Sequence, residues 1–131
     1  MAGRSSPHPF DPEDLLRFIE LKPFAAGWKE LRLDDDDLLA LQTAIMLNPR
    51  AHPVVTETGG LRKMRFAPPR WKRGKRGAVR VCYVFLQDYG TVLLVIVYPK
   101  GEKDTLTRDE KKQIRSLIQR IEREFESGVI K

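Results

Sequence analysis

The sequence predicts an α+β fold built on a small, mostly antiparallel sheet, with the element order β-α-α-β-β-β-α. Three β-rich segments between residues 61 and 98 are separated by turn signals, which is typical of a meander. Helical apolar spacing with capping signals comes before and after these segments. The length of 131 residues corresponds to one domain. We therefore expect an N-terminal helix pair, the meander and a C-terminal helix.

The chain begins with a segment that is expected to be a flexible arm. Residues 1–14 are rich in Pro, Ser and Asp and show no periodicity. The apolar run 15–21 predicts the first strand. Pro23 is a favourable first-turn residue, so a short helix is expected over 24–33. The helix is expected to bury Phe24, Trp28 and Leu31.

Four consecutive aspartates, Asp34–Asp37, are expected to begin the second helix, where carboxylates meet the positive end of the helix dipole. Asn48 and Pro49 are expected to end it. One face of this helix is apolar and carries Leu38, Leu41, Ala44 and Ile45. A metal site is the disfavoured alternative for the aspartates, because adjacent carboxylates do not converge on one ion.

The meander is expected to follow the turn at residues 58–60. In its first strand, alternation places Leu61, Lys63 and Arg65 on one face and Arg62, Met64 and Phe66 on the other. A basic loop over 68–77 leads to strands at 78–86 and 91–98, joined by a hairpin at 87–90. The last of these strands is apolar on both faces, which predicts a central position in the sheet.

A capping box of Thr107 and Glu110 is expected to begin the last helix, and Gly128 to end it. Its apolar stripe comprises Ile114, Leu117, Ile118, Ile121 and Phe125. The predicted domain therefore covers 15–127, with a tail at 128–131.

Positive charge is concentrated in one part of the chain. Lys and Arg number 24 against 18 Asp and Glu, a net charge of +6. The segment from Thr58 to Gln87 contains no acid, and its cations are Arg62, Lys63, Arg65, Arg70, Lys72, Arg73, Lys75, Arg76 and Arg80. This segment predicts a polyanionic partner, because phosphate neutralisation dominates nucleic-acid affinity. The alternative is a basic surface that serves solubility alone.

The usual catalytic groups are scarce. His8 and His52 lie in the arm and in a Pro-rich connection, and Cys82 lies within a strand, which favours a buried thiol over a nucleophile. Neither a phosphate-cradling Gly-rich loop nor metal-ligand spacing is present, so no cofactor or metal is expected. The longest apolar run, from Val92 to Tyr98, is much shorter than the ~20 residues of a membrane span. We expect a cytoplasmic protein with no membrane contact.

Lysine, arginine and tyrosine remain as candidate catalysts. RNA cleavage by its own 2′-hydroxyl requires charge stabilisation on the phosphorane oxygens, which guanidinium groups provide bidentately. A lysine among arginines can serve as the proton acceptor. Lys63, Arg65 and Arg80 are the candidates, because they fall on adjacent strands. A solvated cationic sheet face is the alternative.

Three strings carry a resemblance to a known family. They are GGLRKMRF at 59–66, GAVRVCY at 77–83 and YPKGEKDTLT at 98–107. Together they resemble the RelE/ParE toxin superfamily, and most closely its HigB-type branch, over roughly residues 18–124. The resemblance implies a RelE-like fold and the toxin of a type II toxin–antitoxin pair that cuts messenger RNA in the ribosomal A site. Its implied partners are the ribosome, messenger RNA and a cognate antitoxin of the helix-turn-helix DNA-binding type.

The resemblance also implies the residues of the site. The catalytic cations correspond to Lys63, Arg65 and Arg80, with Lys100 or Lys103 as a further cation after the last strand. RelE proteins place a tyrosine beyond that strand and this sequence has none there, so Tyr98 is the candidate substitute and a core tyrosine the alternative. The expected RNA- and ribosome-binding residues are Arg62, Arg70, Trp71, Lys72, Arg73, Lys75, Arg76 and Lys103. Trp71 either stacks on a base or packs onto the sheet.

Fold resemblance does not fix the activity. A ParE-like inhibitor of DNA gyrase and a non-catalytic nucleic-acid-binding module are the two alternatives. The spacing Lys63-x-Arg65 together with the separately placed Arg80 favours the endoribonuclease.

Overall fold

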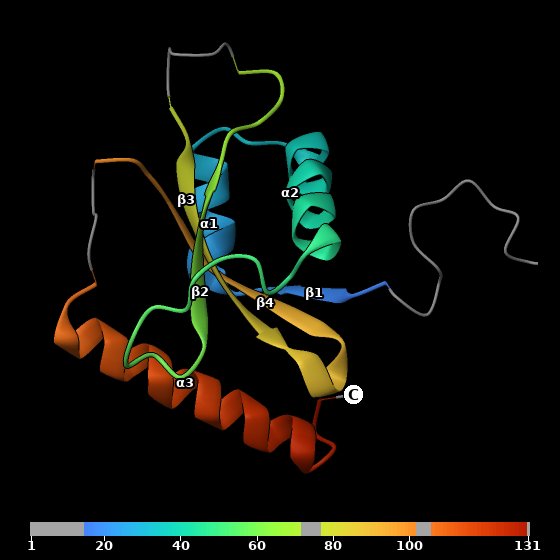
Figure 1. Ribbon diagram of the computed structural model, residues 1–131, viewed down its shortest axis with the longest axis vertical. Helices are drawn as coiled ribbons and strands as arrows, with labels where there is room; N and C mark the ends of the chain where they lie inside the picture. The colour runs from blue at the N-terminus through green and yellow to red at the C-terminus, as the bar shows by residue number, and fades with distance from the viewer. Residues whose placement is uncertain (1–14, 72–76, 102–105, 131) are drawn as a thin grey trace, which may run out of the picture.

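The computed structural model describes residues 15–71, 77–101 and 106–130. They form a four-stranded mixed sheet with three α-helices, which confirms the predicted α+β class (Figure 1). The elements in chain order are β1 (Arg17–Glu20), α1 (Lys22–Glu30), α2 (Asp35–Leu47), β2 (Leu61–Phe66), β3 (Val79–Leu86), the 3₁₀ turn η3 (Gln87–Tyr89), β4 (Thr91–Pro99) and α3 (Arg108–Glu126).

The sheet has the strand order β1-β4-β3-β2. The last three strands form the expected antiparallel meander, whereas β1 lies parallel to β4. The turn between β3 and β4 is closed by Gly90 in the left-handed conformation, at φ 56°. β4 is central, as its apolar character on both faces predicts, because it must be covered from both sides.

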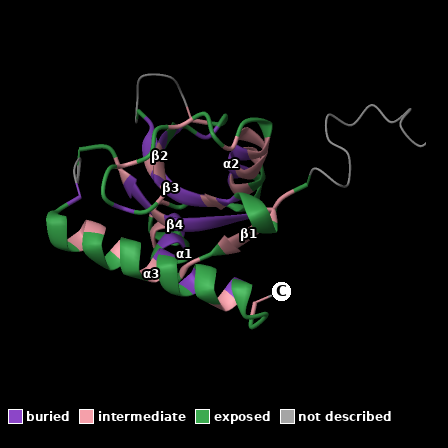
Figure 2. Cartoon of the chain, turned by 60° about the horizontal axis from the view of Figure 1, so that its bottom comes forward, coloured by how far each residue is buried: buried purple, intermediate pink, exposed green. Residues whose placement is uncertain are grey.

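Helices cover both faces of the sheet, so the protein has two hydrophobic cores. α1 and α2 pack on one face, around Phe24, Trp28 and Leu41. α3 packs on the other face through Ile118 and Ile121. Figure 2 shows that buried residues gather in the strands, while α3 turns an exposed side outward. The strands can therefore present different chemistry on their two faces.

The first helix begins two residues earlier and ends three residues earlier than the sequence indicates. α1 ends at Glu30, and Arg32 turns the chain with a φ of 58°. Phe24 and Trp28 are buried as expected, whereas Leu31 is the half-buried C-cap residue that packs against the core, and Leu33 is buried as well. The turn at Arg32 cannot be read from local spacing, since a non-glycine residue at positive φ carries no sequence signal of its own.

The second helix begins as predicted. Asp34 is the N-cap, and its carboxylate accepts a hydrogen bond from the Asp37 backbone N–H at 2.9 Å. The Asp37 carboxylate accepts one from the Asp34 N–H at 2.9 Å, which completes a capping box. The aspartates therefore cap a helix, as expected. Within the described ranges, no three His, Cys, Asp or Glu side chains are placed to hold a metal ion.

A glycine in α1 permits close contact between helix and sheet. A Cβ atom added at Gly27 would lie 2.6 Å from the Val97 carbonyl oxygen of β4, which is backbone and cannot move aside. At a solvent-exposed position within a helix, replacing Gly with Ala stabilises the folded protein by about 1 kcal/mol. Here the clash should outweigh that gain, so we expect Gly27→Ala to lower the free energy of unfolding by about 1–3 kcal/mol.

Urea denaturation of Gly27→Ala beside Ala26→Gly tests this expectation. Ala26 is exposed on the same helix, so its replacement measures helix propensity without the clash, at about 1 kcal/mol of destabilisation. A Gly27→Ala variant more stable than the wild type would contradict the close contact.

A β-bulge lies in the middle of β4. The pairing of β3 with β4 shifts register between Cys82 and Tyr83, so that Cys82 lies opposite Ile96 and Tyr83 opposite Leu94. Val95 and Ile96 consequently both belong to the core on the α3 side. The bulge re-establishes alternation beyond it, which sends Tyr98 to this same face.

None of the helices in the described part of the chain combines the length and the apolar character that a membrane span requires.

Candidate functional site

The strand register gathers three candidate cations on one face of the sheet. Arg65 of β2 lies directly opposite Arg80 of β3, which lies opposite Tyr98 of β4. Lys63 is two residues before Arg65 and lies opposite Cys82. Because alternate residues share a face, all five side chains lie on the side of the sheet that packs against α3. We call Lys63, Arg65 and Arg80 the cation row.

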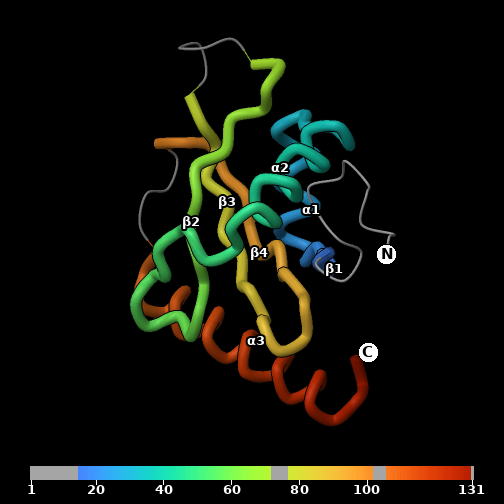
Figure 3. The backbone as a smooth tube through the Cα atoms, turned by 45° about the vertical axis from the view of Figure 1, so that its right-hand side comes forward, coloured from blue at the N-terminus to red at the C-terminus, as the bar shows by residue number. Residues whose placement is uncertain are grey.

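α3 covers only part of that face. Leu61 and Val84, nearer the hairpin, are buried beneath it. Figure 3 shows the meander strands continuing past α3 toward the opposite end of the sheet. There Arg65 is exposed, while Lys63 and Arg80 are half-buried. The cation row therefore stands beside the helix, where it is accessible to a ligand.

Two arginines face each other across neighbouring strands. Directly opposed residues have Cβ atoms about 4.5–5.5 Å apart, and like charges at this spacing are destabilising. Arg80 donates a hydrogen bond from Nη1 to the Ala78 carbonyl at 3.4 Å. Across the residues that the structure describes, neither Arg65 nor Arg80 forms an ion pair with a carboxylate. An anion placed between them would relieve this repulsion.

Cys82 and Tyr98 are the buried neighbours of the cation row, opposite Lys63 and Arg80 respectively. Cys82 is fully buried, which confirms the structural thiol expected from its position within a strand. Burial raises the pKa of Cys82 to about 11, while a hydrogen bond from Tyr98 and the nearby charge of Lys63 lower it. Tyr98 is only 6% exposed and packs in the α3-side core, so its burial matches the core alternative.

The buried, high-pKa thiol leads to a simple expectation. Cys82 should resist alkylation by iodoacetamide at pH 8 in native buffer, because the thiolate is the reactive form and both burial and the raised pKa suppress it. It should react promptly in denaturing urea, as mass spectrometry of the modified chain would show. Rapid labelling of the native protein would contradict this packing.

Lys100 is placed at the same end of the sheet. It follows β4, is exposed, and its Cδ would lie 3.9 Å from a Cβ at Gly77, just before β3. Lys103, the alternative cation, lies outside the described residues. The loop cations Lys72, Arg73, Lys75 and Arg76 lie outside them too.

Arg62 and Arg70 are not brought to the cation row. Arg62 points to the opposite face of β2 and donates to the carbonyls of Arg50 at 3.1 Å and His52 at 2.7 Å. Arg70 binds the carboxylate of Asp37, with Nη2 to Oδ2 at 2.7 Å and Nε to Oδ1 at 3.1 Å. Both side chains hold loops in place instead of extending the cation face.

Trp71 also lies away from the row. It is half-buried and packs against the core formed with α1 and α2. Of the two alternatives for this residue, the structure adopts packing onto the sheet.

Sequence reasoning misses two contacts that shape this end of the protein. One is the pair of Arg70 with Asp37, whose pKa is lowered chiefly by hydrogen bonds from Arg70 and is raised in part by burial. The other is Tyr83, whose hydroxyl donates to the Pro49 carbonyl at 2.8 Å and lies 3.2 Å from His52 Nδ1. Neither could be found from local spacing, because the partners are more than thirty residues apart.

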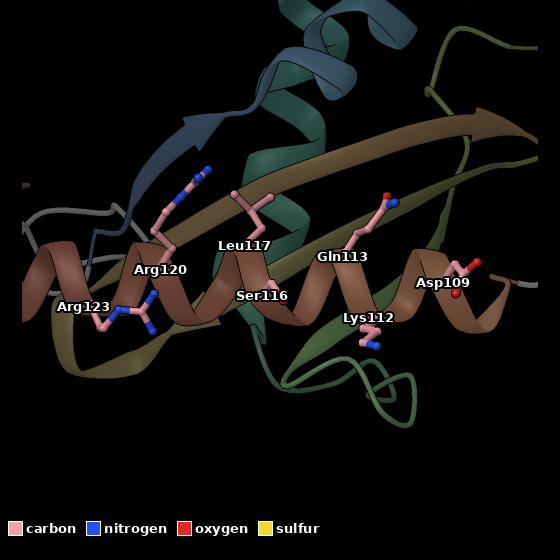
Figure 4. Close-up of a pocket in the computed structure, with 7 residues that line it drawn as sticks. All are labelled: Asp109, Lys112, Gln113, Ser116, Leu117, Arg120 and Arg123. Carbon is pink, nitrogen blue, oxygen red and sulfur yellow. The ribbon is translucent and has the colours of Figure 1, made fainter.

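A separate depression lies along the outer side of α3 (Figure 4). Its volume is about 590 Å³, and its lining residues are Asp109, Lys112, Gln113, Ser116, Leu117, Arg120 and Arg123. Figure 4 shows these side chains along the length of one helix. None of them belongs to the cation row, so this depression is not part of the candidate site.

A comparison of the chain with models of known protein families finds no match.

Proposed function

We propose that this protein is the toxin of a type II toxin–antitoxin pair and an endoribonuclease that cuts translated messenger RNA in the ribosomal A site. The observation that carries the proposal is the opposition of Arg65 and Arg80 on an accessible sheet face, with Lys63 beside them. A fold that tolerates this repulsion gains from binding a phosphate.

The proposed reaction uses the RNA itself as nucleophile. The 2′-hydroxyl oxygen attacks the adjacent phosphorus, and the bond from phosphorus to the 5′-oxygen breaks, which leaves a 2′,3′-cyclic phosphate and a 5′-hydroxyl. Arg65 and Arg80 bind the nonbridging oxygens, where negative charge grows in the transition state. Lys63 is the candidate acceptor of the 2′-hydroxyl proton, and the departing 5′-oxygen takes a proton from solvent to become the 5′-hydroxyl. Lys100 supplies further positive charge at the end of β4.

The same proposal includes the partners. Ribosomal RNA is a polyanion that suits the basic loop over 68–77, and messenger RNA would lie across the cation row. The resemblance further implies an antitoxin of the helix-turn-helix type, which would keep the enzyme inactive in the cell.

Induced expression in a bacterial host tests the proposal. We expect growth arrest with the wild type, together with in-frame cuts in translated messages on primer-extension mapping. The Lys63→Ala/Arg80→Ala variant should show neither, at equal protein levels. Arrest without cuts would contradict the nuclease and favour gyrase inhibition. Neither arrest nor cuts from the wild type would contradict a toxin and favour a non-catalytic binding module.

A further inference from the structure

α2 carries an apolar stripe that nothing in the described chain covers. The ten residues 38–47 contain no charged side chain, although one side of the helix faces away from the core. A helix with apolar residues on all sides is usually buried on all sides. Here Leu41 and Ile45 are buried, whereas Leu39 and Leu47 on the other side are 60% and 66% exposed.

The exposed stripe is symmetric about one residue. Leu39 and Leu47 lie four residues before and four residues after Thr43, which places all three on the side of α2 opposite Leu41 and Ile45. The Thr43 hydroxyl donates to the Leu39 carbonyl at 2.8 Å, so it needs no partner across an interface. A small side chain at the centre with a leucine on either side is self-complementary under a two-fold rotation.

If two copies of α2 pack against each other, the charges at the two ends of the helix favour one orientation of the pair. Asp35 and Asp36 are exposed in the first turn, and the exposed Arg50 follows shortly after the last. A parallel pair would bring the two acidic ends together. An antiparallel pair instead places each acidic end beside the basic end of the other copy, which is electrostatically favourable.

We propose that the protein forms a two-fold symmetric homodimer through α2, with the two helices antiparallel and Thr43 at the axis. Leu39 of each copy then packs against Leu47 of the other, and Asp36 lies beside Arg50. The contact involves one helix face per copy, so it belongs among the smaller interfaces and we expect a dissociation constant in the micromolar range. The proposal is independent of the nuclease activity, because α2 and the cation row lie on opposite faces of the sheet.

Sedimentation equilibrium of the full chain over a concentration series tests the dimer. The wild type should show a reversible monomer–dimer equilibrium. Leu39→Gln and Leu47→Gln should each weaken it by at least about tenfold, because each removes two apolar contacts per dimer. Val129→Gln is the matched control, since Val129 is 73% exposed in the C-terminal segment and lies outside the stripe. Far-ultraviolet circular dichroism would establish that every variant is folded.

A charge exchange tests the orientation. Asp36→Arg and Arg50→Asp should each weaken the dimer, and the double variant should recover most of the wild-type affinity because the pairing is restored with reversed signs. In addition, Thr43→Cys should be cross-linked to itself by a short bis-maleimide, since the two-fold axis brings the two copies of this position together.

Three results would overturn the proposal. A wild type that stays monomeric at its highest soluble concentration would mean that the stripe is unpartnered or is covered by residues 1–14 of the same chain. A dimer that is unaffected by the leucine variants would use another surface. A dimer that the double charge exchange weakens further than either single variant would not have the antiparallel arrangement.

Discussion

Arg80→Ala is expected to reduce RNA cleavage by about a hundred- to a thousandfold, the effect of removing one preorganised group that stabilises a developing charge. Arg80 belongs to the cation row and lies between Arg65 and Tyr98 in the register. The loss should appear in the rate constant at saturating ribosomes, because the interaction strengthens in the transition state. Single-turnover cleavage of a ribosome-bound message measures it.

The same substitution should leave the fold at least as stable as before. Removing one of two opposed arginines relieves their repulsion, worth up to about 1 kcal/mol. A purely structural arginine would instead lower activity and the free energy of unfolding together. Arg80→Lys retains the charge and loses the bidentate geometry, so it should restore only part of the activity. Lys29→Ala, on the exposed side of α1, is the matched control and should cleave normally.

Asp37→Asn is expected to have the largest effect on stability among polar substitutions at the helix ends. Asp37 is 2% exposed, completes the capping box and binds the Arg70 guanidinium. The charged hydrogen bonds and half of the cap would be weakened, while the exposed Arg70 would regain water. We expect a loss of about 2–3 kcal/mol in the free energy of unfolding at pH 7.

The pH dependence identifies the carboxylate as the cause. Hydrogen bonds from Arg70 lower the pKa of Asp37 from its usual 3.8, so the folded protein binds this proton less readily than the unfolded chain. The stabilisation is complete above the usual pKa and is lost as the pH falls through the folded value. The difference between wild type and Asp37→Asn in urea melts should therefore be constant from pH 6 to 8 (a range well above 3.8) and shrink below about pH 4. A difference that persists at low pH would assign the effect to packing.

The helices and strands can be predicted from local sequence patterns, such as capping boxes and apolar spacing, that the structure confirms. The capping box at Thr107 and the helical stripe that ends at Phe125 predict α3, because both depend on neighbours within one helix. Alternation in β2 correctly separates Lys63 from Arg62. The parallel pairing of β1 with β4 does not follow from such patterns, since period-two alternation carries no information about which strand lies beside which.

The candidate site was predictable only in part, for a similar reason. The position of Lys63 and Arg65 on one face follows from spacing, whereas the opposition of Arg65 to Arg80 depends on the register between β2 and β3, which spacing does not give. In the sequence, nothing distinguishes Arg70 from the other lysines and arginines of the basic loop. Its diversion to Asp37 is decided by a tertiary contact across 33 residues, which no local pattern encodes.

The placement of β1 has a consequence for how the protein folds. Arg17 pairs with Thr91, so during synthesis more than seventy further residues must be added after β1 before its partner strand β4 is made. Such non-local contacts raise the contact order and slow the search for the native state, because loop closure must precede the gain from pairing. The meander can form earlier, since its hairpins are local. A nascent chain would thus assemble the cation row before β1 closes the sheet, and the docking of the N-terminal strand would be the late, rate-limiting event.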